Sequence, residues 1–358
     1  MMFQGINDRL MKKRRFSLDL IRVFAVILVI FDHTGENGFE LYWRAKDIGL
    51  QYFLMMFTVF SNGAVFLFFM ISGAVLLGRD ESIREVFTKR ILRYIAIIVL
   101  FSFMYYVRLY IKNPEYGFSI KFFLQYIYER PFITPYWFLY SYLGFLVVLP
   151  ILRAIAKSLD ESGYLLLIGT TMALKFLVIP ERILNFEHIN FTIGFTESFI
   201  IYPLIGYAIV NVFSDRLFCI KTKIMGIVLF VTSLLSSLWL SIIDYDSVSK
   251  GSQHVIGIFN FCTTILFFYF IICIFDKGNI KVNSKVEEII EYIGSCSFCI
   301  YLFEDMLRSD IFLKIFSVTG SDYVKLLLCI PYIICMMASG ILISTILRHV
   351  PGVNKLGI

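Results

Sequence analysis

Charge is scarce in this sequence of 358 residues. Only 17% of the residues are Asp, Glu, Lys or Arg, whereas 58% are hydrophobic. A soluble domain carries about 25% charged residues and fewer apolar ones. The composition therefore excludes a soluble globular protein and predicts an all-α, polytopic membrane protein.

The motifs of several common enzyme classes are also missing. No H-E-x-x-H, P-loop or G-x-S-x-G pattern occurs, and nearly all seven cysteines lie in apolar runs, where cysteine behaves as a small hydrophobe. The C-x-x-C pattern from Cys296 to Cys299 lies in a predicted membrane segment, without the βαβ context of a redox domain. We therefore expect no metal site, no redox site and no permanently bound cofactor. The net charge of +6 reflects membrane topology and predicts no nucleic-acid partner.

About ten apolar segments are long enough to cross a bilayer as helices. We predict them at residues 16–34, 51–78, 89–110, 135–156, 162–179, 191–213, 222–243, 254–275, 288–308 and 323–347. Basic residues are more frequent on one side, beginning with Lys12 to Arg15, which predicts that both termini are cytoplasmic. No repeat, cleavable signal or appended soluble domain is evident. Residues 1–358 are therefore expected to form a single multi-pass domain of the plasma membrane, in contact with its lipid.

The first apolar segment carries a stripe of ionisable side chains. Arg22 and His33 are eleven residues apart, so both leave the same helix face, roughly 16 Å apart along the axis. Asp19 and Glu36 fall within about 40° of that face. Since a charge within a membrane helix costs roughly 2.5–3.5 kcal/mol, we expect the stripe to face other helices or a wet cavity. The alternative is an interfacial Asp19–Arg22 pair with Arg22 reaching the headgroups.

Six landmarks along the chain occur in a fixed order. They are Arg22 with His33, Phe68 to Gly73, Lys89 to Arg93, Tyr136 to Leu139 with Tyr142 and Pro150, Tyr202 to Tyr207, and Ile300 to Leu302. In this order they resemble the acyltransferase-3 family of membrane O-acyltransferases, over almost the whole chain. The resemblance implies transfer of an acyl group, commonly acetyl, from the co-substrate acyl-CoA on the cytoplasmic side. The implied acceptor is a sugar hydroxyl of a cell-surface polysaccharide or lipid-linked glycan.

The resemblance also implies catalytic roles. His33 is expected to be the general base, since a neutral imidazole can accept the proton of an alcohol. Arg22 is expected to hold the phosphate end of the donor or to stabilise charge in the channel. Lys89, Arg90 and Arg93 cluster at helical spacing and suit the phosphates of acyl-CoA. The alternative is that these three are ordinary cytoplasmic basic residues.

One position departs from the family pattern. Two residues after the Ile300 to Leu302 landmark the family has a histidine, whereas this sequence has Glu304. Glu304 is expected either to orient His33, as a third catalytic residue, or to form a structural ion pair with Arg308 one helical turn away.

Four residues are expected to contribute to acceptor binding. They are Asp19, Glu36, Tyr136 and Trp137. The two aromatic residues could instead belong to an aromatic belt at the outer membrane interface, and Ser72 with Gly73 could simply permit close helix packing. His33 and Glu304 are both expected near the outer end of their helices. A donor that binds from the cytoplasm must therefore extend a long arm towards the outer side to reach them.

Two other functions are compatible with these features. A polar stripe within ten helices also suits a glycan exporter or transporter of the same superfamily. A third hypothesis is a partner subunit that works with glycan-assembly proteins.

Overall fold

The computed structural model describes residues 15–177, 179, 199–247, 259–278, 280, 282–309 and 320–351, and all regular structure in these ranges is helical. Five helical stretches are long and apolar enough to cross a membrane. They are Ile48–Leu76, Ile83–Lys112, Thr134–Ser158, Ile220–Ile243 and Asp322–Leu347. The all-helical class is therefore confirmed for the described residues, and the five stretches are consistent with a multi-pass membrane protein. The ten spans and the cytoplasmic placement of both termini stay predictions.

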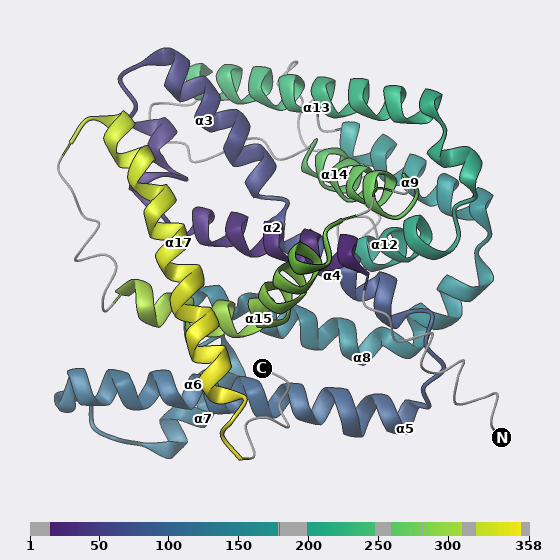
Figure 1. Ribbon diagram of the computed structural model, residues 1–358. Helices are drawn as coiled ribbons and strands as arrows, with labels where there is room; N and C mark the ends of the chain where they lie inside the picture. The colour runs from purple at the N-terminus through teal and green to yellow at the C-terminus, as the bar shows by residue number, and fades with distance from the viewer. Residues whose placement is uncertain are drawn as a thin grey trace.

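Thirteen α-helices are assigned along the described chain, and Figure 1 labels them. They are α2 (Phe16–Asp32), α3 (Ile48–Ser61), α4 (Ala64–Leu76), α5 (Ile83–Glu85), α6 (Leu92–Lys112), α7 (Ile120–Glu129), α8 (Trp137–Ser158), α9 (Glu161–Phe176), α12 (Ile201–Asn211), α13 (Ile220–Ser247), α14 (Asn260–Phe275), α15 (Ser284–Leu307) and α17 (Asp322–Leu347), with the π-helical turn η3 (Val86–Ile91) joining α5 to α6.

Several predicted segments differ from the observed helices. The segment predicted at 51–78 corresponds to one membrane-length stretch, Ile48–Leu76, in which a turn at Asn62 and Gly63, two residues of low helix propensity, separates α3 from α4. The segment predicted at 89–110 begins earlier, through α5 and η3. Parts of the segments predicted at 162–179, 191–213 and 254–275 lie outside the described residues.

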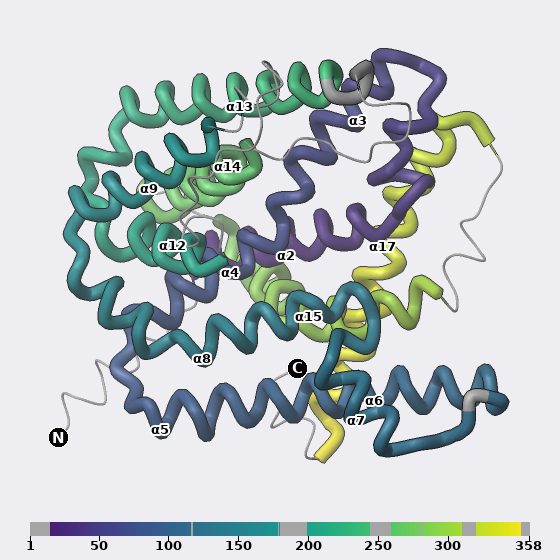
Figure 2. The backbone as a smooth tube through the Cα atoms, turned by 180° about the vertical axis from the view of Figure 1, so that it is seen from behind, coloured from purple at the N-terminus to yellow at the C-terminus, as the bar shows by residue number. Residues whose placement is uncertain are grey.

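Helix α2 lies at the centre of the bundle in both views (Figures 1 and 2). It packs most extensively against α15 and α4, and also contacts α14, α17 and α3. Ile21, Ala25 and Ile30 are fully buried, and Phe24 is the single exposed side chain of the helix. The ionisable stripe of this helix therefore lies among other helices, away from the outer surface of the bundle.

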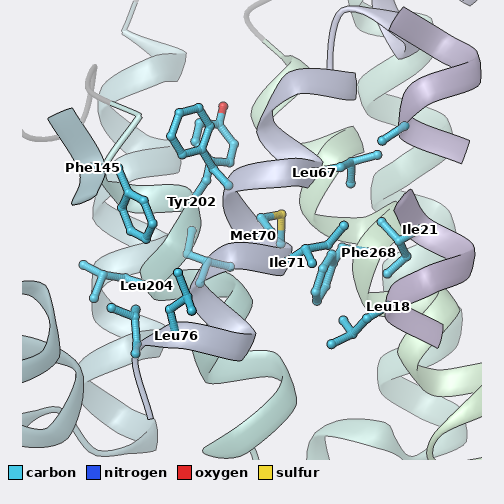
Figure 3. Packing of buried hydrophobic residues seen from close by; sticks show 14 of the residues in the cluster. Leu18, Ile21, Leu67, Met70, Ile71, Leu76, Phe145, Tyr202, Leu204 and Phe268 are labelled. Atoms are coloured by element: carbon cyan, nitrogen blue, oxygen red, sulfur yellow. The ribbon is translucent and has the colours of Figure 1, made fainter. Parts of the chain in front are cut away.

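Helices α4 and α12 meet at their glycines. Figure 3 shows Leu76 of α4 beside Leu204 of α12, within the largest buried cluster. A Cβ atom added to Gly73 would overlap the backbone of Pro203, and one added to Gly206 would overlap the backbone of Met70. Two of the sequence landmarks are therefore the two sides of one close helix crossing.

This crossing predicts a large effect of a single methyl group. Gly73→Ala is expected to destabilise the protein by about 1–3 kcal/mol, because the backbones of α4 and α12 would have to separate. Gly144→Ala in α8 is the matched control, since a Cβ there meets nothing within 4 Å. It is expected to be neutral or to stabilise by about 0.5–1 kcal/mol. Thermal unfolding of both variants in detergent tests this, and equal melting temperatures would contradict the close approach.

Candidate active site

A cavity of about 370 Å³ lies among α2, α4, α6, α8 and α15. Both Arg22 and His33 line it, together with Ser72, Tyr142 and Tyr301. Because one continuous helix carries Arg22 and His33, the two side chains stand about 16 Å apart along its axis. The cavity is therefore elongated along α2 and has chemically different ends.

The two ends can be named by their residues. The basic end contains Arg22, Lys89, Arg90 and Arg93. The imidazole end contains His33 with Pro135 and Trp137, which lie at the start of α8. An elongated site with several cations at one end and one imidazole at the other suits a long substrate with an anionic terminus.

The imidazole end is built around an acid–histidine pair. His33 Nδ1 lies 2.6 Å from Glu304 Oε2, and only 2% of the Glu304 side chain is exposed. Since a carboxylate oxygen accepts hydrogen bonds, Nδ1 carries the hydrogen, and Nε2 of the neutral ring keeps its lone pair. The imidazole is 24% exposed and lines the cavity, so this lone pair is available to a substrate proton.

Local backbone features bring the pair together. His33 is the C-terminal cap of α2, and its backbone N–H donates to the carbonyl of Val29. Glu304 lies near the end of α15, which packs along α2. Gly294 permits this approach, because a Cβ there would press on Asp19.

Arg308 Nε lies 3.9 Å from the second Glu304 oxygen, and Arg308 also pairs with Asp305 at 2.5 Å. Both predicted contacts of Glu304 exist, and the one to His33 is the shorter.

Arg22 is held by its neighbour one helical turn earlier. Its guanidinium lies 2.5 Å from Asp19 Oδ1, and the Asp19 side chain is 2% exposed while that of Arg22 is 24% exposed. The i,i+3 pair expected from the sequence is thus present, but it faces the interior. Asp19 does not line the cavity, so its contribution is to orient Arg22.

At the basic end, Glu81 joins two arginines. Arg90 donates to Glu81 through Nε at 2.8 Å and through a terminal nitrogen at 2.5 Å, and Arg153 donates to the same carboxylate at 2.8 Å. Arg153 is buried and also donates to the carbonyl of Leu76 at 3.0 Å. The hydrogen bonds from Arg90 and then Arg153 lower the pKa of Glu81 from 4.5 to about 2. Glu81 thereby fixes the position of Arg90 beside the cavity.

The other two cations of the basic end differ in their partners. Lys89 lies in η3 and pairs with Glu85 at 2.8 Å on an exposed surface. Arg93, in the first turn of α6, makes no hydrogen bond or ion pair with any residue that the structure describes. The π-helical turn changes the register between the two residues from the α-helical spacing expected from the sequence. All three basic residues nevertheless line the cavity.

The expected acceptor residues are not all brought together. Trp137 lines the cavity, but Tyr136 is fully buried and its hydroxyl donates to the carbonyl of Leu302 at 2.9 Å. Adjacent helical residues diverge by about 100°, which explains why the two aromatics differ. Glu36 follows α2 in a 3-10 turn and pairs with Arg44 on the exposed surface, away from the cavity. The geometry therefore supports only Trp137 of these three as a contact for acceptor.

Several lining residues were missed from the sequence. Tyr94, Ser297 and Phe298 line the cavity near Ser72 and Tyr142, the two residues of the sequence motifs whose hydroxyl oxygens lie 3.2 Å apart. These residues belong to apolar aromatic runs, in which no pattern separates cavity-facing from lipid-facing positions. In the described part of the chain, no group of three or more His, Cys, Asp or Glu side chains could hold a metal ion.

Neutralising Glu81 tests the architecture of the basic end. Glu81→Gln is expected to destabilise the protein by about 3 kcal/mol at neutral pH, because buried Arg153 loses its counter-charge. The folded-state pKa of about 2 lies below the ordinary 4.5, so this stabilisation is complete above pH 4.5 and is lost as the pH falls towards 2. Thermal unfolding across this pH range should therefore show a loss in the parent protein that the variant lacks.

Glu85→Gln is the control for this experiment. Glu85 pairs with Lys89 on the surface, where 41% and 70% of the two side chains are exposed. Exposed ion pairs contribute at most about 1 kcal/mol. If both variants unfolded at the same temperature, the anchoring of two arginines by Glu81 would be refuted.

Comparison with known proteins adds one finding. A family model described as an acyltransferase domain matches residues 15–349, a range that contains every residue of the cavity. No curated protein matches the chain, and no solved structure does.

Proposed function

We propose that this chain, which belongs to the acyltransferase-3 family, is a membrane O-acetyltransferase. The proposed donor is cytoplasmic acetyl-CoA, and the proposed acceptor is a sugar hydroxyl of a cell-surface polysaccharide or of its lipid-linked precursor. The observation that carries the proposal is the single cavity that contains both the basic end and the His33–Glu304 pair.

Donor binding is proposed at the basic end. Coenzyme A carries phosphates at one terminus and the thioester at the other, separated by the long pantetheine arm. Arg22, Arg90 and Arg93 offer guanidinium groups, which bind phosphate oxygens through paired hydrogen bonds. The distance of about 16 Å along α2 from Arg22 to His33 suits the arm between phosphate and thioester. The thioester carbon then lies at the imidazole end.

The chemistry proposed for the imidazole end uses His33 as base and then as acid. Nε2 accepts the proton of the sugar hydroxyl while the hydroxyl oxygen attacks the carbonyl carbon of the thioester. The tetrahedral intermediate collapses by breaking the carbon–sulfur bond, and the imidazolium returns the proton to the departing sulfur. The products are an acetyl ester and free CoA thiol. Glu304 accepts a hydrogen bond from Nδ1 throughout, which stabilises the imidazolium that forms between the two proton transfers.

Mass spectrometry of the surface glycan tests the proposed function. Cells that carry the gene are expected to contain acetyl esters that are absent from a deletion strain, and cell membranes are expected to transfer label from acetyl-CoA to the glycan. The exporter hypothesis predicts a different result. The polymer disappears from the surface of the deletion strain, and the polymer that remains in the cells is acetylated as in the parent strain. That second result would overturn the proposal.

A further inference from the structure

A second hollow, of about 590 Å³, adjoins the imidazole end of the cavity. Pro135 and Trp137 line both spaces, so the hollow borders the place where His33 lies. Its other walls come from the end of α7, the segment that follows α7, and the end of α15. The hollow lies at the opposite end of the cavity from the cations that we propose for the donor.

Aromatic rings form one part of this hollow. Tyr126 and Phe132 lie with ring centroids 5.0 Å apart, and Trp137 is 38% exposed. Tyr and Trp combine a large apolar face with a polar tip, and they lose little conformational entropy on binding. Sugar rings present C–H faces that pack on such side chains and hydroxyls that bond to polar groups beside them. A site with these walls therefore suits a saccharide better than an acyl chain.

The charged residues of the hollow indicate a second property of the ligand that it suits. Its charged lining consists of Arg130, Arg308 and Asp305. Arg308 is paired with Asp305 at 2.5 Å, whereas Arg130 lies over the Tyr126 ring, 4.5 Å from its centroid. Arg130 forms no ion pair with any residue in the described ranges. An exposed guanidinium, held on an aromatic ring and without a carboxylate partner, is complementary to an anionic group on a ligand.

We propose that this hollow is the acceptor site and that it takes an acidic saccharide, with a carboxylate or phosphate group bound by Arg130. This inference rests on the proposed function, since it names the substrate of that same site. The sugar ring packs on Trp137 and Tyr126, and Trp137 then lies between acceptor and imidazole. Arg308 contacts both the hollow and Glu304, so it joins the acceptor site to the catalytic pair.

Direct binding measurements on the full-length protein in lipid nanodiscs test the inference. The probes are three sets of oligosaccharides, composed of neutral hexoses, of hexuronic acids, and of hexose phosphates. At least one acidic set is expected to bind more tightly than the neutral set. Arg130→Gln is expected to weaken this binding about tenfold, because a charge-assisted hydrogen bond is lost. Acetyl-CoA binding is expected to be unchanged.

Lys121→Gln provides the matched control. Lys121 is an exposed residue of α7 that does not line the hollow, so the substitution removes the same charge from the same region. The acidic set that binds identifies the source of the charge as carboxylate or phosphate. Failure of all three sets to bind, equal binding of neutral and acidic sets, or equal effects of Arg130→Gln and Lys121→Gln would overturn the inference.

The failure of the two proposals can be distinguished in the same samples. If acidic sugars bind in an Arg130-dependent manner but no acetyl group is transferred from acetyl-CoA, the binding site stands and the enzymatic proposal fails. If transfer occurs but Arg130→Gln leaves sugar binding and the KM for acceptor unchanged, the enzyme stands and the acceptor site lies elsewhere.

Discussion

Replacement of His33 by alanine is expected to reduce acetyl transfer by about 10²–10⁴-fold, the usual contribution of a positioned general base. A sugar hydroxyl is almost entirely protonated at neutral pH, so without the imidazole it attacks the thioester poorly. Arg22 and the rest of the basic end are untouched by this change, and donor binding is expected to persist. The measurement is transfer of label from acetyl-CoA to glycan in membranes, with donor affinity measured in parallel.

His349→Ala is the control for this substitution. His349 is exposed, follows α17, and its Nδ1 bonds to the Thr345 carbonyl at 2.8 Å. It does not line the cavity, so its removal is expected to leave transfer unchanged. If the His33 variant folds, binds acetyl-CoA and still transfers at the parental rate, His33 is not the base.

Glu304→Gln is expected to cause a loss of similar size. Substitution of the corresponding acid by its amide in the serine-protease triad costs about 10⁴-fold in kcat, because the histidine is left in the wrong tautomer. Here the amide removes the charge that stabilises the imidazolium 2.6 Å away and allows Nδ1 to become the acceptor. We therefore expect kcat to fall about 10²–10⁴-fold while KM for acetyl-CoA stays the same.

A fall in kcat with an unchanged KM distinguishes a role of Glu304 in positioning His33 from a role in supporting the fold. Glu288→Gln, at an exposed position of the same helix, is the matched control and is expected to be silent. A purely structural role of Glu304 with Arg308 predicts a lower melting temperature and less active protein, without a selective fall in kcat. That outcome would remove Glu304 from the mechanism.

Local helix geometry was sufficient to predict the position of the stripe on α2. The spacing of Arg22 and His33 depends only on the pitch of one helix, so both could be placed on one face without knowledge of the fold. The partner of His33 required more, because Glu304 is 271 residues away in the chain. Its contact with His33 depends on the packing of α15 along α2, which no local pattern indicates.

Other features depend on tertiary contacts that leave no mark in the sequence. Glu81 lies between two helices, and its partners Arg90 and Arg153 come from two different elements. Tyr136 and Trp137 are neighbours of equal aromatic character, yet only Trp137 reaches the cavity. Hydropathy predicted the membrane-length segment at 51–78, but it does not detect the turn at Asn62 and Gly63 within it.

The π-helical turn from Val86 to Ile91 has a consequence for how this chain tolerates length changes. A π turn holds one residue more than an α turn, so deletion of a single residue would let the backbone close into regular α-helix. The α turn would complete the same rotation with one residue fewer, so the helix upstream would keep its orientation relative to α6. A one-residue deletion within these six residues should therefore be tolerated better than one in the middle of α6, where everything upstream would rotate by about 100° relative to the rest of the helix.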